Sequence, residues 1–77
     1  MKNRVSIHLF ATLAEFTPAN AENYPLSPGR SVQDLLAELD VPLEEVKLIF
    51  INGIKGELSS IVRDGDRIGV FPPIGGG

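Results

Sequence analysis

The stretch that decides the fold is SVQDLLAEL, residues 31–39. Its apolar residues recur with the helical spacing i, i+3, i+4 and i+7: Val32, Leu35, Leu36 and Leu39. This spacing predicts an amphipathic helix of about three turns whose apolar stripe faces a core. Ser31 is placed to cap the N-terminus, and Asp34 lies near the positive end of the helix dipole. Pro42 closes the helix, because the residue before a proline is disfavoured in the helical region.

Upstream of this helix, residues 4–9 alternate between polar and apolar types, and the apolar set is Val5, Ile7 and Leu9. Strict alternation of this kind predicts a half-buried strand. Residues 11–20 contain a short helix-compatible stretch that Pro18 ends. Residues 23–28 are compatible with a second, short strand. Pro25 would restrict that strand to an edge of the sheet, because proline cannot donate to a strand ladder.

Downstream of the helix, residues 48–51 form a continuous apolar run that ends at Asn52-Gly53, which predicts a central strand entering a tight turn. A weaker strand or loop follows to Leu58. Asp64-Gly65-Asp66 marks a second turn before a final strand over residues 67–71. Strands on both sides of one helix predict an α+β fold. The β-grasp arrangement, a mixed sheet of four or five strands packed on one main helix, fits the element lengths best.

Composition and charge exclude several classes of function. The chain has 77 residues and a net charge of −3, with no run of Lys or Arg that would bind phosphates, so nucleic acid is not an expected partner. It has no cysteine and one histidine, so neither a thiolate metal site nor a Cys–His nucleophile is available. No signal peptide is recognisable and no apolar run approaches about 18 residues. We therefore expect a cytoplasmic protein that is monomeric when free, binds no membrane, metal or cofactor, and is not an enzyme.

Two polar features are expected to be solvated surface. His8 lies on the polar face of the first predicted strand. A group of carboxylates surrounds the C-terminal end of the predicted helix: Glu38, Asp40, Glu44 and Glu45. The best functional role for this acidic group is a surface that meets a basic partner. Neither feature predicts a catalytic residue.

The C-terminal stretch VFPPIGGG, residues 70–77, is the strongest candidate for a functional segment. Ile68 and Val70 share one face of the final strand, so Phe71 projects from the other face as a candidate partner contact. Pro72 and Pro73 cannot donate to a ladder, so strand pairing stops there and the chain leaves in an extended direction.

Residues 1–73 are therefore expected to form the domain, and residues 74–77 a flexible tail that threads into a partner's active site. The tail spans at most about 14 Å when extended, and Gly75, Gly76 and Gly77 have no side chains to block a narrow channel. A terminal carboxylate at Gly77, once adenylated by a partner, becomes a mixed anhydride that a sulfur or amine nucleophile can attack. Because the chain has no cysteine, any sulfur that it carries must sit on that carbonyl as a thiocarboxylate.

The ending FPPIGGG after DGDRIGV resembles that of the ubiquitin-like sulfur carriers, most closely the small subunit of molybdopterin synthase. In that family a DGD turn, a hydrophobic strand, two prolines, an aliphatic residue and a terminal Gly-Gly recur in this order. The opening VSIHLFATLAEF is similar to the family's first strand, with its aromatic–alanine pair at Phe10-Ala11. SVQDLLAEL and INGI are similar to its helix and central hairpin.

The resemblance implies that Gly77 is adenylated by an enzyme related to the ubiquitin-activating class, which uses ATP, and is then converted to a thiocarboxylate. In the molybdopterin branch, the tail inserts into the large subunit of the synthase and delivers sulfur to the pterin precursor. The residues that match the family's tail and its partner contacts are Phe10, Phe71, Pro72, Pro73, Ile74, Gly76 and Gly77. Gly75 departs from the family, which commonly has Ala, Ser or Thr there.

Several alternatives stay open. Carriers for thiamine, cysteine, tungsten cofactor or tRNA thiolation have related endings, although thiamine-type carriers usually lack the two prolines. A ubiquitin-like protein modifier would form an isopeptide bond through the same carboxylate. A non-covalent β-grasp binding module would act through its surface alone.

Overall fold

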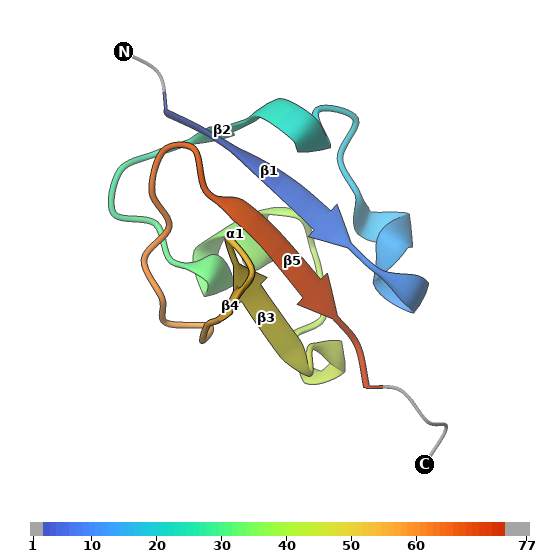
Figure 1. The fold of residues 1–77 in the computed structure, drawn as a ribbon. Helices are drawn as coiled ribbons and strands as arrows, with labels where there is room; N and C mark the ends of the chain where they lie inside the picture. Colours follow the sequence, from blue (N-terminus) through green and yellow to red (C-terminus); the bar gives the residue numbers. More distant parts are fainter. Residues whose placement is uncertain (1–2, 74–77) are drawn as a thin grey trace.

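The computed structural model describes residues 3–73, which form five strands, one α-helix and three short 3-10 helices (Figure 1). In chain order the elements are β1 (Asn3–Leu9), η1 (Ala11–Phe16), η2 (Ala21–Asn23), β2 (Tyr24–Leu26), α1 (Val32–Glu38), η3 (Leu43–Glu45), β3 (Leu48–Ile51), β4 (Ile54–Lys55) and β5 (Arg67–Phe71). A mixed five-stranded sheet packed on one main helix confirms the predicted α+β, β-grasp fold. Within residues 3–73, no helix has the length and apolar character needed to cross a membrane.

The sheet brings the first and last strands of the domain together. Its strand order is β2-β1-β5-β3-β4, with β1 parallel to β5 and the other neighbours antiparallel. Figure 1 shows β1 and β5 side by side in the middle of the sheet. Their register pairs Ile7 with Ile68 and Leu9 with Val70, and all of these side chains are buried. The base of the C-terminal segment is therefore held at the centre of the fold.

The prediction that residues 48–51 form the central strand is wrong. These residues do form a strand, β3, but β5 is central and β3 has the two-residue β4 on its outer side. In β3, Ile49 is buried, whereas Leu48 is exposed and Phe50 is half-buried. A continuous apolar run is typical of a strand covered on both faces, but here only one face is covered. The predicted edge strand with Pro25 is confirmed as β2.

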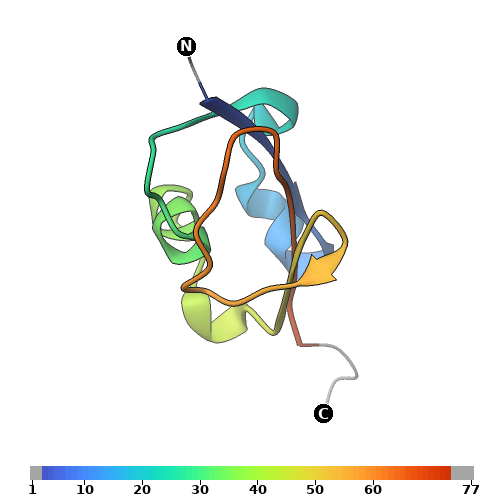
Figure 2. The ribbon, with the colours of Figure 1, turned by 60° about the vertical axis from the view of Figure 1, so that its left-hand side comes forward.

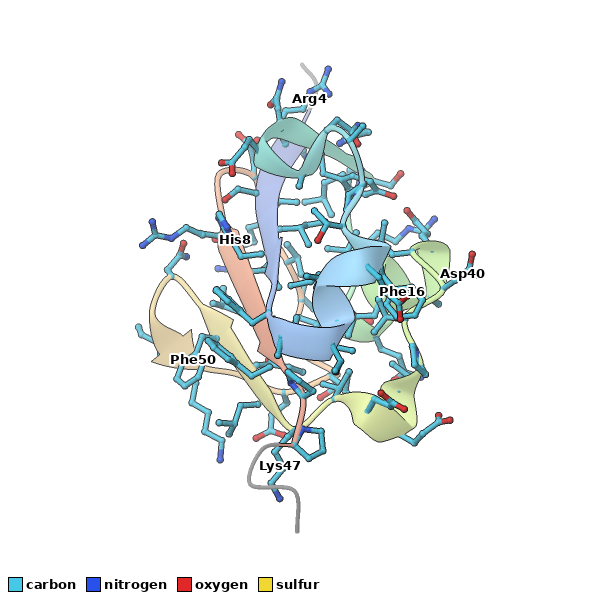
Figure 3. The ribbon with its side chains drawn as sticks, turned by 90° about the vertical axis from the view of Figure 1, so that its right-hand side faces the viewer. Arg4, His8, Phe16, Asp40, Lys47 and Phe50 are labelled. Carbon is cyan, nitrogen blue, oxygen red and sulfur yellow. The ribbon has the colours of Figure 1, made fainter. Side chains whose placement is uncertain are left out.

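The core lies between one face of the sheet and α1, and Figure 2 shows the helix to one side of the strands. Alternate strand residues and the apolar stripe of the helix supply it. Its members are Val5, Ile7, Leu9, Leu13, Leu26, Val32, Leu35, Leu36, Val41, Ile49, Val62, Ile68 and Val70. In Figure 3 the helices lie on one side of the sheet, while His8 and Phe50 lie on the other side. The sheet thus has one buried face and one outward face.

The main helix starts where the sequence predicts and ends earlier. The Asp34 backbone N–H donates to Ser31 Oγ (3.1 Å) and the Ser31 N–H donates to Asp34 Oδ2 (3.0 Å), which forms a capping box. The helix ends at Glu38 after seven residues, so the expected three turns are too long.

A Schellman motif ends the helix two residues before Pro42. The Val41 N–H donates to the Leu36 carbonyl (3.0 Å) and the Asp40 N–H donates to the Ala37 carbonyl (3.2 Å). Asp40 adopts a left-handed conformation with a φ of 63°, and the buried Val41 then packs in the same core as Leu36. The reversal at Asp40, rather than Pro42, therefore stops the helix.

Candidate functional site

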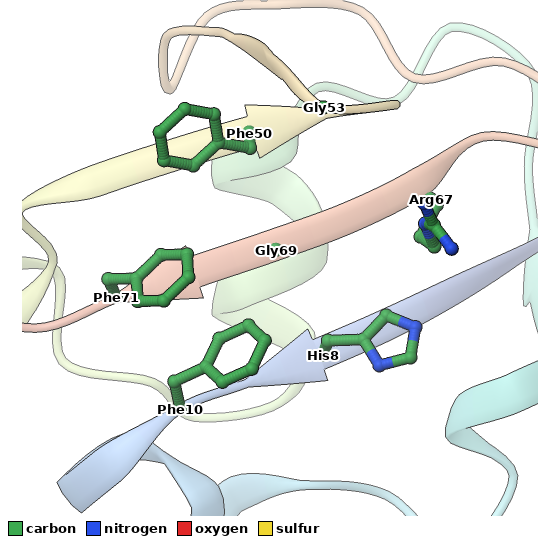
Figure 4. Close-up of a pocket in the computed structure, with 7 residues that line it drawn as sticks. All are labelled: His8, Phe10, Phe50, Gly53, Arg67, Gly69 and Phe71. Carbon is green, nitrogen blue, oxygen red and sulfur yellow. The ribbon is translucent and has the colours of Figure 1, made fainter.

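The outward face of the sheet carries a continuous group of aromatic rings. The pleat that buries Ile68 and Val70 turns Gly69 and Phe71 outward on the same strand. Register then places His8 and Phe50 on either side of Gly69, because each is its cross-strand partner. Figure 4 shows these residues on three neighbouring strands, with Phe10 directly beyond the end of β1.

The four aromatic side chains form a row in which each ring lies next to the following one, in the order His8, Phe10, Phe71 and Phe50. Phe10 and Phe71 stack with centroids 4.3 Å apart and an interplanar angle of 5°. Phe50 meets Phe71 edge to face at 5.8 Å, and His8 lies 6.5 Å from Phe10 at an angle of 24°. Both arrangements of the phenylalanine pairs are favourable for aromatic quadrupoles. We call His8, Phe10, Phe50 and Phe71 the aromatic face.

Exposure distinguishes the members of this face. Phe10 keeps 41% of its surface exposed, whereas Phe71 is half-buried between the rings of Phe10 and Phe50. His8 is also half-buried rather than fully solvated, and it is the polar end of the aromatic face. Soluble proteins rarely leave a contiguous group of aromatic side chains partly exposed without a binding role. The aromatic face is therefore the candidate functional surface.

A shallow depression of about 350 Å³ opens at the centre of this face, near the small end of the range for ligand pockets. Gly69 forms its floor, because a glycine on the central strand leaves the space between its neighbours unfilled. The residues around it are His8 and Phe50 across the strands, Arg67 and Phe71 along β5, and Phe10 and Gly53 beyond the ends of β1 and β3. The depression suits one or two inserted side chains better than a large cofactor.

Hydrogen bonds anchor the chain up to the point where the predicted tail begins. The Phe71 carbonyl accepts from the Lys47 N–H (2.8 Å), and the Val70 carbonyl accepts from the Phe10 N–H (3.1 Å). β5 ends at Phe71 as predicted, since Pro72 cannot continue the ladder. Pro72 is buried and Pro73 is exposed, so Pro73 offers more surface to a partner. The predicted tail residues Ile74, Gly75, Gly76 and Gly77 lie outside the described residues.

The predicted acidic group lies on the helix side of the molecule. Figure 3 places Asp40 on the side opposite His8 and Phe50. Glu38 was expected to be solvated, but its carboxylate forms an ion pair with Arg30 (3.0 Å) and accepts a hydrogen bond from the Tyr24 hydroxyl (3.0 Å). Partial burial, and then the bond to Glu38, raise the pKa of Tyr24 above its usual value. Within residues 3–73, no three His, Cys, Asp or Glu side chains gather as a metal site.

Comparison with protein families decides the identity of this fold. The family described as Mut7-C ubiquitin matches residues 2–75, which is nearly the whole chain. The chain belongs to the Mut7-C ubiquitin family. No curated protein matches it in sequence. The predicted resemblance to ubiquitin-like proteins is confirmed at this level.

Solved structures place this Mut7-C ubiquitin chain among small ubiquitin-like proteins. The HVO 2177 protein of Haloferax volcanii is similar with a TM-score of 0.76 and 20% identity, covering 99% of this chain and 88% of that one. A Pyrococcus furiosus protein, provisionally described as molybdopterin converting factor subunit 1, has a TM-score of 0.69 and 25% identity, covering 94% and 99%. Small archaeal modifier protein 1 of Methanosarcina acetivorans has a TM-score of 0.64 and 28% identity, covering 100% and 99%.

The structure adds further residues to the contacts that the sequence of this Mut7-C ubiquitin chain predicts. Phe10 and Phe71 are predicted contacts, and the structure brings them into direct stacking. His8, Phe50 and Gly69 were missed, because only the strand register brings them together. Alternation gave a usable signal for Phe50, since it lies one residue from the buried Ile49 and so must point outward.

Proposed function

We propose that this chain is a sulfur carrier that functions with Gly77 as its terminal residue, and that Gly77 is converted to a thiocarboxylate that donates its sulfur. The observation that supports the proposal is the position of the aromatic face. Phe10 and Phe71 stack where the chain leaves β5 on its way to residues 74–77. A partner that grips these rings would therefore hold the start of the tail next to its own active site.

The chemistry requires two steps, both catalysed by a partner. A carboxylate oxygen of Gly77 attacks the α-phosphorus of ATP, and pyrophosphate leaves. A hydrosulfide ion supplied by a partner then attacks the acyl carbon through its sulfur, and AMP leaves with the electron pair of the broken C–O bond. The product is a thiocarboxylate on Gly77. ATP binds to the activating enzyme, so this chain is a cosubstrate and contributes no catalytic residue.

Docking and threading are linked through conformational entropy. Ordering a glycine-rich segment costs free energy, since glycine loses more backbone freedom than any other residue. Aromatic side chains on a rigid sheet give contact area at little entropic cost, and such residues dominate the binding energy of many interfaces. Binding at Phe10 and Phe71 would offset the cost of ordering residues 74–77.

We assign the sulfur to molybdopterin synthesis. The assignment is supported by the Pro72-Pro73 pair before the glycines and by the similarity to the Pyrococcus furiosus protein. The second partner would then be the large subunit of molybdopterin synthase, which receives residues 74–77 in its active site. Under this proposal the free carrier is a cytoplasmic monomer. The Mut7-C ubiquitin description itself names no pathway, and Gly75 differs from the residues common in the molybdopterin branch.

A protein modifier is the second candidate, favoured by the similarity to small archaeal modifier protein 1. The same acyl adenylate would then react with a lysine amine of a target, and AMP would leave as an isopeptide bond forms. Peptide mapping separates the two functions, because a modifier leaves Gly77 attached to lysines of other proteins.

Reconstitution tests the proposal directly. The full chain is incubated with an activating enzyme from the same genome, ATP and sulfide, and its intact mass is measured. We expect a species heavier by the exchange of one oxygen for sulfur, located at Gly77 by fragmentation. A chain lacking Gly76 and Gly77 is the matched control and should not react. Unchanged cellular function of that truncated chain would instead identify a non-covalent binding module.

A further inference from the structure

The charged residues of the five strands are all cations, and all of them lie on the outward face of the sheet. Strand alternation and register identify the outward residues of the five strands as Arg4, Ser6, His8, Pro25, Leu48, Phe50, Lys55, Arg67, Gly69 and Phe71. The charged members of this set are all cations, although acidic residues outnumber basic ones by ten to seven in the chain. The outward face is therefore basic and aromatic, in an acidic protein.

One of these cations, Arg67, lines the depression over Gly69. We call this depression the Gly69 socket, and its lining residues are Gly69 at the floor and His8, Phe10, Phe50, Gly53, Arg67 and Phe71 around it. Phe71 and Phe50 make one end apolar, while Arg67 stands two residues before Gly69 on β5 and makes the other end cationic (Figure 4).

We propose that the Gly69 socket accepts one apolar side chain of a partner protein, and that Arg67 binds a carboxylate beside that side chain. The inference rests on the docking step of the proposed function and names the surface chemistry of the partner. Charge complementarity carries it, because a partner surface with carboxylates near an apolar projection would match Arg67 and Lys55 at once. A guanidinium can bind a carboxylate through two parallel hydrogen bonds, which also fixes the orientation of the partner.

Arg67 is better placed for this role than the other cations of the face. Arg4 is engaged elsewhere, since its Nη1 donates to the Asn23 carbonyl (3.2 Å) near β2. Lys55 lies opposite Phe50 across β3 and β4 and does not line the socket. Arg67 lines the socket itself and its side chain is exposed.

A protein partner fits the face better than single-stranded nucleic acid does. Bases need free aromatic faces on which to stack, and a positive groove that follows the phosphates. Phe10 and Phe71 stack on each other at 4.3 Å, so each ring has one face already covered. The cations Arg4, Lys55 and Arg67 are spread over three strands, and the net charge is −3. These features match an acidic, apolar protein surface.

The test selects random linear peptides displayed on phage against the immobilised full chain. Two variants alter the socket: Gly69→Leu fills it and Arg67→Glu reverses its charge. Arg63→Glu is the matched control, because it makes the same charge change in the loop before β5 and does not line the socket. A Cβ at Gly69 would meet Phe10 Cε2 at 3.6 Å and Phe71 Cε1 at 3.9 Å, which are ordinary contacts, so Gly69→Ala fits the site without rearrangement.

We expect the enriched peptides to share an apolar residue next to Asp or Glu. Their affinity should fall about tenfold or more on Gly69→Leu and Arg67→Glu, which is typical of a central contact, and should stay unchanged on Arg63→Glu. Gly69→Ala, which fills less of the socket, should give an intermediate loss. In two-dimensional NMR spectra of the labelled chain, a selected peptide should shift the amide signals of His8, Phe50 and Gly69.

Several results would overturn the inference: no enrichment, a basic consensus, or equal binding to the wild-type chain and Gly69→Leu. An oligothymidylate that binds more tightly and shifts the same amide signals would replace the protein partner with nucleic acid. The measurement needs neither ATP nor sulfur. Loss of the socket would therefore leave the thiocarboxylate proposal standing, and failure of sulfur loading would leave peptide binding unaffected.

Discussion

Phe10 is the residue at which a substitution should affect partner binding most clearly while leaving the domain folded. Its ring stacks on Phe71 and yet keeps 41% of its surface exposed. We predict that Phe10→Ala lowers the free energy of unfolding by about 1–3 kcal/mol, because the stacked pair adds about 1 kcal/mol to the effect of the area that the ring buries. The rate of sulfur loading at limiting carrier should fall about tenfold, as for an exposed contact in an interface.

Ile61→Ala provides the control for this prediction. Ile61 is also apolar and exposed, at 52%, but it lies across a β-bridge from Ser31 and away from the aromatic face. Urea unfolding and single-turnover loading are measured for both variants. Equal loading rates for Phe10→Ala and Ile61→Ala would show that the aromatic face does not contact the activating enzyme.

At the scale of single elements, α1 depends on its capping box. Ser31 and Asp34 satisfy each other's backbone N–H groups at the start of a helix of only seven residues. We predict that Ser31→Ala lowers the free energy of unfolding by about 1 kcal/mol. Circular dichroism in urea measures the change. A neutral effect would mean that packing of Val32 and Leu35 alone fixes the start of the helix.

Asp34 links the same cap to pH. Hydrogen bonds from the Ser31 backbone and then its hydroxyl lower the pKa of Asp34 below the usual 3.8. As the pH falls, the Asp34 carboxylate is therefore protonated first in the unfolded chain. The stabilisation by the ionised Asp34 is present above pH 3.8 and is lost as the pH falls through the lower pKa of the folded state. Between about pH 5 and pH 3, the stability of the wild-type chain should decrease more steeply than that of Asp34→Asn. Parallel pH profiles for the two proteins would contradict this assignment.

The left-handed residue at the other end of α1 offers a stabilising substitution. Asp40 has a φ of 63° at the position that glycine usually occupies in a Schellman motif. We predict that Asp40→Gly raises the free energy of unfolding by up to about 1 kcal/mol, because a side chain in this conformation is strained. Asp40→Ala should lower it, since alanine keeps the Cβ without the local hydrogen bonding of aspartate. Urea midpoints that fall for both variants would show that the Asp40 carboxylate outweighs the strain.

These two helix ends also show what the sequence can predict. The start of α1 was predictable, because Ser31 and Asp34 are a local signal three residues apart. The end was not, since Asp40 replaces the glycine that would have marked it. The rule that disfavours helix before a proline pointed to Pro42, two residues beyond the real reversal.

At the scale of the whole molecule, the sheet order could not be read from hydrophobic patterns. The apolar run at residues 48–51 resembled a central strand, but centrality belongs to β5, which pairs with both β1 and β3. Pairing between residues about sixty positions apart depends on tertiary packing, which leaves no local signature. The candidate site was also predictable only in part. Phe10 and Phe71 could be predicted from the sequence, whereas Gly69 belongs to the site only because the strand register places it between His8 and Phe50.

The same topology makes the stability of the domain independent of changes beyond residue 73. β5 is fixed between two strands up to Phe71, so a change beyond residue 73 should not disturb the core. We predict that adding one residue after Gly77 leaves the melting temperature unchanged and abolishes sulfur loading, because the carboxylate no longer sits at the adenylation site. A large fall in melting temperature would indicate that residues 74–77 pack against the domain.

The proposed sulfur on Gly77 is tested most directly by the intact mass of the chain purified from its native host. We predict a fraction heavier by the exchange of one oxygen for sulfur, with fragmentation placing the change on a terminal carboxyl group at Gly77. A chain whose Gly77 carboxylate stays unmodified, even with its activating enzyme, ATP and a sulfur donor present, would contradict it.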